Sequence, residues 1–213
     1  MTMKYALAGM IALAIGVASA GVAQAGNLIV DGDFATPNQG GGWSDTAVPG
    51  WVNNNGDALE VGSTPIYGLA CVTGGCQNLE VNANTFDSDS QTVSGLTVGA
   101  QYNLSWLYGG RPGGGTQLLD VSFGGAPLVT DTGSLGVWSL NAYVVTASAT
   151  SETLTFASEV TSGLPSYGNE ITAVSLTAVP EPATWSLLLM GLGGAGAAMR
   201  MARRKTVAAS SVA

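Results

Sequence analysis

Period-two alternation of apolar and polar residues, cut into short runs by glycine, is the feature that most constrains the fold of this chain. In the stretch QYNLSWLYGG, Tyr102, Leu104, Trp106 and Tyr108 are separated by single, mostly polar residues. Because side chains of a strand point alternately to its two faces, these four share one face. Between the two ends of the chain we find no long stretch with the apolar spacing of a helix. The pattern predicts an all-β domain.

Further strands are predicted along the chain at short spacing. The stretch SETLTFASEV aligns Leu154, Phe156 and Val160, and LLDVSFGG, LNAYVVTASA and ITAVSLTAV show alternation or β-branched enrichment. Shorter strands are expected at NLIV, ALEV and NLEV. Many short strands with glycine-rich turns favour two packed antiparallel sheets. Because the two cysteines are too close to bridge two sheets in the immunoglobulin manner, we expect a jelly-roll β-sandwich.

Both ends of the 213-residue chain differ in composition from the middle, which leaves a single domain between them. Lys4, an apolar run and then the small residues of Ala23-Gln24-Ala25 follow the order of a secretory signal peptide. We therefore predict a signal peptide over residues 1–25, recognised by the Sec export machinery, and a β-sandwich domain over residues 26–178.

The predicted domain is strongly acidic. Between Gly26 and Val179 it holds thirteen Asp and Glu residues against one base, Arg111, which is a formal net charge of −12, and the whole chain has no histidine. Phosphate neutralisation by lysine and arginine supplies most of a protein's non-specific affinity for nucleic acid, so we expect no nucleic-acid partner. Cations or neutral ligands suit such a domain better.

Cys71 and Cys76 lie five positions apart in CVTGGC. In an exported chain this spacing predicts a disulfide that closes a small loop. Metal or redox chemistry is the alternative, but two cysteines without histidine do not make up a typical zinc site, and the spacing is not that of C-x-x-C.

Three residues are candidates for ligand binding. Arg111 lies in GGRPGGG, a predicted hairpin tip that lacks the lysine and hydroxyl residue of a phosphate-binding loop, and it either pairs with a carboxylate or faces a ligand. Aromatic rings offer flat platforms for sugars. Trp106 alternates with apolar neighbours and is expected in the core, whereas Trp43 and Trp51 lie among glycine, proline and asparagine and are expected to be exposed.

Carboxylates supply the remaining candidate chemistry. Asp31 and Asp33 form an Asp-x-Asp pair of the kind that calcium prefers, so a structural calcium ion is one interpretation. Solvated turn residues are the other, because aspartate is common in turns. For catalysis, the absence of histidine and lysine from the domain leaves only carboxylate pairs of the glycosidase type, and no spacing singles out an acid and a nucleophile. We predict that the domain is not an enzyme.

The C-terminal part of the chain combines a proline-rich motif, an uncharged stretch from Ala183 to Met199 and a basic cluster. The motif residues are Pro180, Glu181, Pro182 and Trp185, and the basic cluster is Arg200, Arg203, Arg204 and Lys205. The seventeen uncharged residues would span roughly 26 Å as a helix, the short limit for a bilayer core. We therefore predict a transmembrane helix with a cytoplasmic tail over residues 206–213 and the domain outside the inner membrane.

This order of features resembles the PEP-CTERM sorting signal of Gram-negative bacteria, in its PEP-x-x-W-A variety, over residues 179–205. Ser186 stands where that variety has alanine. The resemblance implies that an exosortase, a membrane enzyme, cuts near the motif. It further implies that the body lies in the periplasm, attached to the inner membrane, before processing, and afterwards joins the cell surface or the extracellular polysaccharide matrix of a biofilm. A plain membrane anchor is the alternative.

The stretches NLIVDGDF, DSQTVSGLTVGAQYNLSWLYGG and GNEITAVSL carry a second resemblance. They are similar to the opening strand, a hairpin and the last strand of the galactose-binding-like jelly rolls found in many secreted carbohydrate-binding modules, and the likeness covers nearly all of residues 27–178. Thr172 stands where that pattern has aspartate, and Ala35 where it often has glutamate. Both differences weaken the expectation of that family's calcium ion.

These features together predict an exported, non-enzymatic domain that binds extracellular polysaccharide. Two alternatives remain open. One is a structural matrix or coat protein without sugar affinity, and the other is a carboxylate-type glycosidase, which needs two acidic side chains facing each other across an open cleft.

Overall fold

The computed structural model describes residues 26–161, 164–180 and 189–200 of the chain. Ala25–Pro180 form one compact unit, which we call the body. The predicted signal peptide over residues 1–25 lies outside the described residues, as does the tail over residues 206–213.

The described part of the body contains eleven β-strands and one short 3-10 helix, η1 (Thr64–Tyr67). The strands are β1 (Trp43–Asp45), β2 (Trp51–Asn53), β3 (Glu60–Ser63), β4 (Gln77–Glu80), β5 (Ser88–Ser94), β6 (Gln101–Gly109), β7 (Leu118–Phe123), β8 (Ala126–Thr132), β9 (Ser139–Thr146), β10 (Ser151–Ser158) and β11 (Glu170–Ala178). The domain is therefore all-β, as the alternation predicts.

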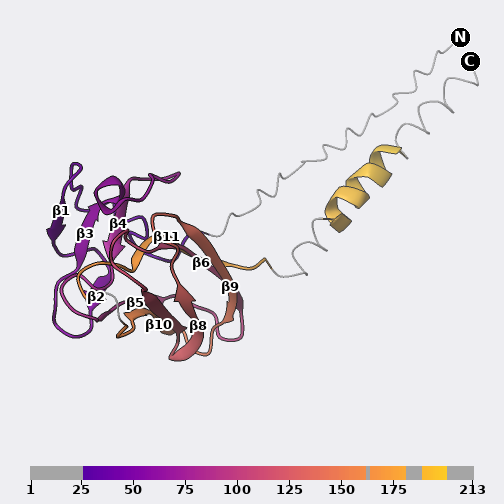
Figure 1. Cartoon of the computed structure of the whole chain (residues 1–213). Coiled ribbons are helices and arrows are strands. Elements are labelled where there is room, and N and C mark those ends of the chain that lie inside the picture. The colour runs from indigo at the N-terminus through magenta and orange to yellow at the C-terminus, as the bar shows by residue number, and fades with distance from the viewer. Residues whose placement is uncertain (1–25, 162–163, 181–188, 201–213) are drawn as a thin grey trace, which may run out of the picture. The chain divides into compact units, whose positions relative to one another are not determined.

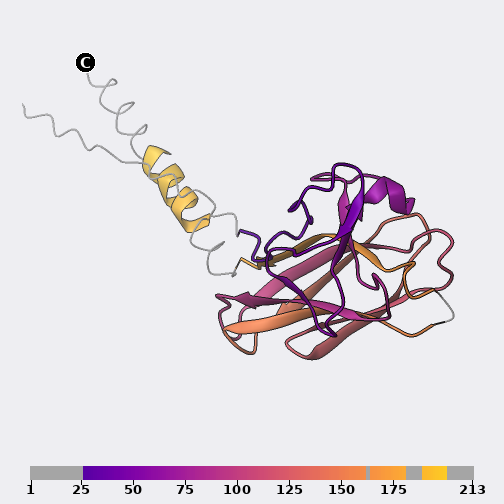
Figure 2. The ribbon, with the colours of Figure 1, turned by 90° about the vertical axis from the view of Figure 1, so that its left-hand side faces the viewer.

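The strands form two antiparallel sheets. The six-stranded sheet has the order β1-β3-β4-β11-β6-β9, which runs from left to right in Figure 1. The five-stranded sheet has the order β2-β5-β10-β7-β8. The turned view in Figure 2 shows the two layers stacked on each other.

The path of the chain makes this sandwich a jelly roll. From β4 to β7, and again from β8 to β11, each strand lies in the opposite sheet from the strand before it. Only hairpins such as β7–β8 keep two successive strands in one sheet. This repeated crossing between two packed sheets is what the jelly-roll prediction requires, so the predicted fold class is confirmed.

The core lies between the sheets, where the alternating apolar residues meet. Trp106 is fully buried, as predicted, and its ring centroid lies 5.5 Å from those of both Phe156 and Tyr143. Tyr102, Leu104, Trp106 and Tyr108 of β6 are all buried, which confirms the face assigned to this strand.

Two details of the strand predictions are wrong. Val160 is 80% exposed, because β10 ends at Ser158 before the alternation reaches it. The stretch NLIV is not a strand, although Leu28 N donates to Leu176 O at 2.9 Å. The side chain of Asn27 takes the place of the backbone hydrogen bonds of a paired strand there, since its Oδ1 accepts hydrogen bonds from the backbone N–H groups of Ile29 and Leu176.

Beyond the body, residues 189–200 form a helix. Within the described ranges, no helix is both long enough and apolar enough to cross a membrane. The predicted transmembrane stretch begins at Ala183, and residues 183–188 lie outside the described residues.

Candidate functional site

Three glutamates lie side by side on the outer face of the six-stranded sheet. Glu60 on β3 and Glu170 on β11 are both register partners of Glu80 on β4. Leu79, directly before Glu80 on β4, belongs to the core, and so does Ile171, directly after Glu170 on β11. Because successive side chains of a strand point to opposite faces, the side chains of the glutamates lie on the outer face. Even so, only 7%, 0% and 0% of the surfaces of Glu60, Glu80 and Glu170 are exposed. We call these three glutamates the carboxylate row.

A loop from Thr64 to Cys76 covers the carboxylate row. The Tyr67 ring lies directly over Gly62, where an added Cβ would meet ring carbon Cε2 at 2.1 Å. Leu69 packs over Gly109 in the same manner, with its Cδ2 at 2.9 Å from an added Cβ. Glycine is therefore required at position 62, since a side chain would displace the Tyr67 ring, whereas at position 109 the end of the Leu69 side chain would have to shift.

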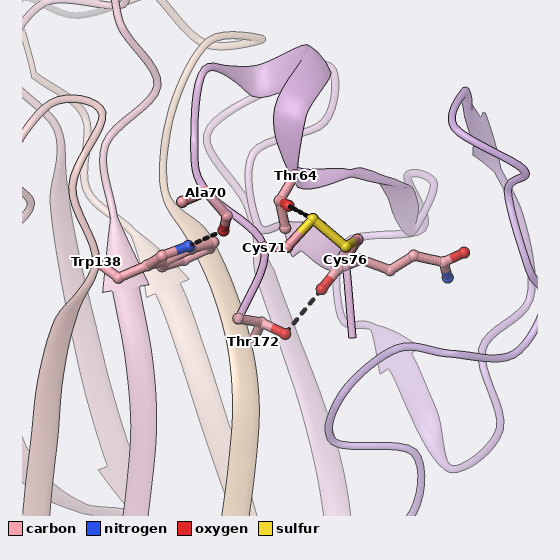
Figure 3. The surroundings of a disulfide bond; sticks show 7 residues. Thr64, Ala70, Cys71, Cys76, Trp138 and Thr172 are labelled. Carbon is pink, nitrogen blue, oxygen red and sulfur yellow. Dashed lines mark hydrogen bonds between the residues drawn. A yellow bond between two sulfur atoms is a disulfide. The ribbon is translucent and has the colours of Figure 1, made fainter. Parts of the chain in front are cut away.

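A disulfide between Cys71 and Cys76 closes this loop, so the predicted bridge is confirmed. Figure 3 shows the hydrogen bonds around it: Trp138 Nε1 donates to Ala70 O at 2.8 Å, and Thr172 Oγ1 donates to the backbone carbonyl of Gln77 at 2.8 Å. The first bond ties the loop to the segment before β9, and the second ties β11 to the start of β4, directly after the loop.

Arg111 completes the cover. Its Nη1 lies 3.0 Å from Glu80 Oε2, and its side chain is 22% exposed. The guanidinium carbon lies 4.7 Å from the ring centroid of Tyr67 and 4.1 Å from that of Tyr167, so both rings contact the cation. Of the two roles that the sequence leaves open for Arg111, the structure shows pairing with a carboxylate.

The three acidic side chains of the carboxylate row outnumber the one base that pairs with them, Arg111. Burial raises the pKa of Glu80 to about 7, with the charge of Glu60 adding to the rise and the Gly168 N–H and Arg111 opposing it. Burial and the charge of Glu80 hold the pKa of Glu170 well above its usual range. The carboxyl groups of Glu80 and Glu170 influence each other, and the raised pKa of both favours a proton on one of the two.

The remaining partners of the row are neutral donors. Tyr67 donates its hydroxyl to Glu60 Oε1 at 2.6 Å, and burial raises the pKa of this phenol, so it keeps its proton. Asn78 Nδ2 donates to Glu170 Oε2. Because the row lies beneath a loop, it lacks the open cleft that the glycosidase interpretation requires.

The two candidate tryptophans lie in different environments. Trp43, on the edge strand β1, is 58% exposed as predicted. It is the register partner of Gly62, so it lies on the same outer face as the carboxylate row. Trp51 is only 4% exposed, and the prediction that it is exposed is wrong. Its ring packs 5.2 Å from Phe34 and its Nε1 donates to Val30 O, because β2 belongs to the five-stranded sheet.

The calcium ion predicted at Asp31 and Asp33 stays a prediction. Their carboxyl groups interact with each other, and burial raises the pKa of Asp31. No group of three or more acidic, histidine or cysteine side chains in the described ranges is placed to hold a metal ion. The nearby carbonyls of Phe34 and Pro37 already accept hydrogen bonds from the side chain of Gln77. Calcium needs six to eight oxygen ligands, so the two aspartates would supply only part of such a site.

Part of the C-terminal motif lies in the described residues. Pro180 is exposed and is the last described residue of the body, and Arg200 is the last described residue of the helix over residues 189–200. The other members of the motif and of the basic cluster lie outside the described residues. They are Glu181, Pro182, Trp185, Arg203, Arg204 and Lys205.

Comparison with protein families identifies the C-terminal segment. Residues 178–205 match the PEP-CTERM protein-sorting motif. The chain is thus a jelly-roll protein that carries a PEP-CTERM sorting signal.

Among curated proteins, halomucin of Haloquadratum walsbyi is 28% identical to this chain in an alignment of 144 residues that covers 64% of this chain. The chain spans about 1% of the length of this relative.

Solved structures similar to the chain include carbohydrate-binding modules. The CBM22-1 xylan-binding domain of a Paenibacillus barcinonensis xylanase is 12% identical, with a TM-score of 0.46 over 65% of this chain and 90% of that one. The CBM22-1 and GH10 modules of a Clostridium thermocellum xylanase, solved with xylohexaose, are 17% identical, with a TM-score of 0.45 over 62% of this chain and 26% of that one.

The carboxylate row was not predicted from the sequence as a cluster. Its members occur in the predicted strands ALEV and NLEV and in GNEITAV, where each glutamate directly precedes a β-branched residue. That recurrence is the signal that points to a shared row, because a charged residue at the same place beside apolar residues in three strands suggests one common face.

Proposed function

We propose that this chain is an exported protein, delivered to the cell surface or extracellular matrix through its PEP-CTERM signal, whose body binds carbohydrate. The sorting motif at residues 178–205 supports delivery. An exosortase-type enzyme would process the signal at the inner membrane.

The exposure of Trp43 is the observation that carries the binding proposal. An indole ring that is 58% exposed and fixed on a paired strand offers a rigid apolar surface to the C–H face of a sugar ring. Asp45 lies two residues along on the same face, exposed, where its carboxylate can accept hydrogen bonds from sugar hydroxyls.

The charge of the body favours a neutral glycan. The thirteen acidic residues between Gly26 and Val179 would repel an anionic polysaccharide. The one base that could oppose this repulsion, Arg111, is held by Glu80 and two tyrosine rings. We therefore expect uncharged hexose or pentose polymers as ligands.

Affinity electrophoresis of residues 26–180 through gels that contain individual polysaccharides tests this proposal. We expect retardation by at least one neutral polysaccharide, and at least about tenfold weaker binding for Trp43→Ala, because the stacking surface is lost. Val52→Ala is the matched control, since Val52 is 57% exposed on the other sheet. Migration that no polysaccharide alters, or a Trp43→Ala variant that binds like the parent, would contradict carbohydrate binding at this face.

A structural role in the matrix is the second candidate function. It is favoured by the uncharged sheet edge at β9, where two copies could associate without any sugar. The glycosidase alternative lacks such support, because the carboxylate row is covered.

A further inference from the structure

Strand β9 is an open edge of the six-stranded sheet, visible at the right-hand margin in Figure 1. Its eight residues, Ser139–Thr146, pair with β6 on one side, and within the described body no strand pairs with the other side. The strand contains no charged residue and no proline. Such an edge presents a row of backbone N–H and C=O groups that another strand can complete.

The side chains of β9 add an apolar stripe to this open edge. Leu140 and Val144 point away from the core and are 71% and 60% exposed, with Ala142 between them. Leu107, the register partner of Leu140, extends the stripe onto β6. The alternate residues face the core, where Tyr143 stacks on Trp106.

The other three sheet edges of the described sandwich are protected. β1 and β2 are only three residues long, and β1 contains Asp45. β8 contains Pro127 and Asp131, and its pairing with β7 is interrupted by an irregularity between Val121 and Ser122. Short strands, proline, charge and bulges are the devices by which proteins prevent edge-to-edge pairing. β9 has none of them.

A second copy of this chain is the occupant that fits β9 best. The body carries a formal net charge of −12, so contact between two copies is repulsive almost everywhere except at an uncharged surface. The strand is also self-complementary. In antiparallel pairing about a two-fold axis at Ala142, Leu140 of each copy faces Val144 of the other, and the small Ala142 faces itself.

We propose that β9 is a self-association edge, at which two copies pair antiparallel and join their six-stranded sheets into one continuous sheet. An eight-residue pairing lies below the roughly 1,200 Å² of a standard interface, so the dimer is weak and forms where the protein is concentrated. The dimer places Trp43 at both outer ends of the joined sheet, because β1 is the opposite margin from β9. This inference does not depend on carbohydrate binding.

Sedimentation equilibrium of residues 26–180 tests the proposal, since Ala25–Pro180 form a compact unit of their own. Over concentrations on the order of 10 µM to 1 mM, the weight-average mass is expected to rise toward twice the monomer mass. Val144→Lys should remain monomeric throughout. Val98→Lys is the matched control, because Val98 is 59% exposed outside the strands and the change in charge is the same.

Hydrogen exchange measured at both ends of this concentration range provides a second readout. We expect slower exchange at high concentration for β9 amides of the parent and of Val98→Lys, and unchanged exchange for Val144→Lys. A parent body that stays monomeric at the highest concentration overturns the proposal. So does association of Val144→Lys equal to that of Val98→Lys, which would place the contact elsewhere.

Discussion

Burial of Glu80 and Glu170 beneath the loop makes the stability of the body depend on pH. The pKa of Glu80 is about 7 in the fold, against 4.5 for an ordinary glutamate. Between these values the folded body keeps a proton that the unfolded chain releases. The stabilisation is therefore complete below about pH 4.5 and is lost as the pH rises through about 7, which corresponds to roughly 3 kcal/mol. The raised pKa of Glu170 acts in the same direction.

Glu170→Gln should reduce this pH dependence. The amide keeps the shape of the carboxyl group, and its Nε2 can donate to Glu80 without any bound proton. We expect the free energy of unfolding to fall less between pH 5 and pH 8 than in the parent, by about 1–3 kcal/mol, with the variant the more stable of the two at pH 8. Urea denaturation at several pH values measures this. Asp45→Asn is the control, because Asp45 is exposed and is the register partner of Glu60 outside the carboxylate row. Equal slopes for Glu170→Gln and the parent would contradict the role of Glu170.

At the scale of elements, the disulfide loop decides what the outer face of the six-stranded sheet presents to solvent. Without the loop from Thr64 to Cys76, the carboxylate row would be an ordinary polar sheet face. The Cys71–Cys76 bridge closes a short ring and contributes about 2 kcal/mol on the chain-entropy estimate. The close approach of Tyr67 to Gly62 then determines how tightly the loop lies on the sheet.

Gly62→Ala should lift the loop from the sheet. An added Cβ would lie 2.1 Å from the Tyr67 ring, so the ring must move and its hydrogen bond to Glu60 is lost. We expect a loss of about 2–3 kcal/mol in the free energy of unfolding, measured by urea denaturation. Gly75→Ala is the control in the same loop, because an added Cβ there meets nothing within 4 Å. If both variants unfold at the same urea concentration as the parent, the loop is not packed as described.

The strand pattern could be predicted from the sequence because alternation is local. The faces of β6 and β7 follow from successive residues alone, whereas an irregularity between Thr172 and Ser175 shifts the alternation of β11. Strands of three residues, such as β1 and β2, are too short to show a period. The burial of Trp51 and of the carboxylate row could not be predicted, because each depends on chain that is distant in sequence. Trp51 packs on Phe156, and the row is covered by a loop and by Arg111.

At the scale of the whole molecule, charge is divided between the body and the ends of the chain. The full chain has a formal net charge of −8, with fourteen acidic and six basic residues. Thirteen of the acidic residues and only one of the basic residues lie between Gly26 and Val179. Removal of either end therefore makes the net charge more negative, and the size of the change depends on whether one end or both are removed.

Processing at both ends should yield a protein of net charge −12, because residues 26–180 keep thirteen acids and Arg111. A plain anchor that loses only residues 1–25 keeps fourteen acids and five bases, which is −9. Isoelectric focusing and intact-mass measurement of protein from the cell surface or medium distinguish the two. We expect the −12 form there, and the more basic form in membranes when Pro180, Glu181 and Pro182 are changed to alanine. A mature surface protein that still carries Arg203, Arg204 and Lys205 would show that the segment is an anchor and not a processed signal.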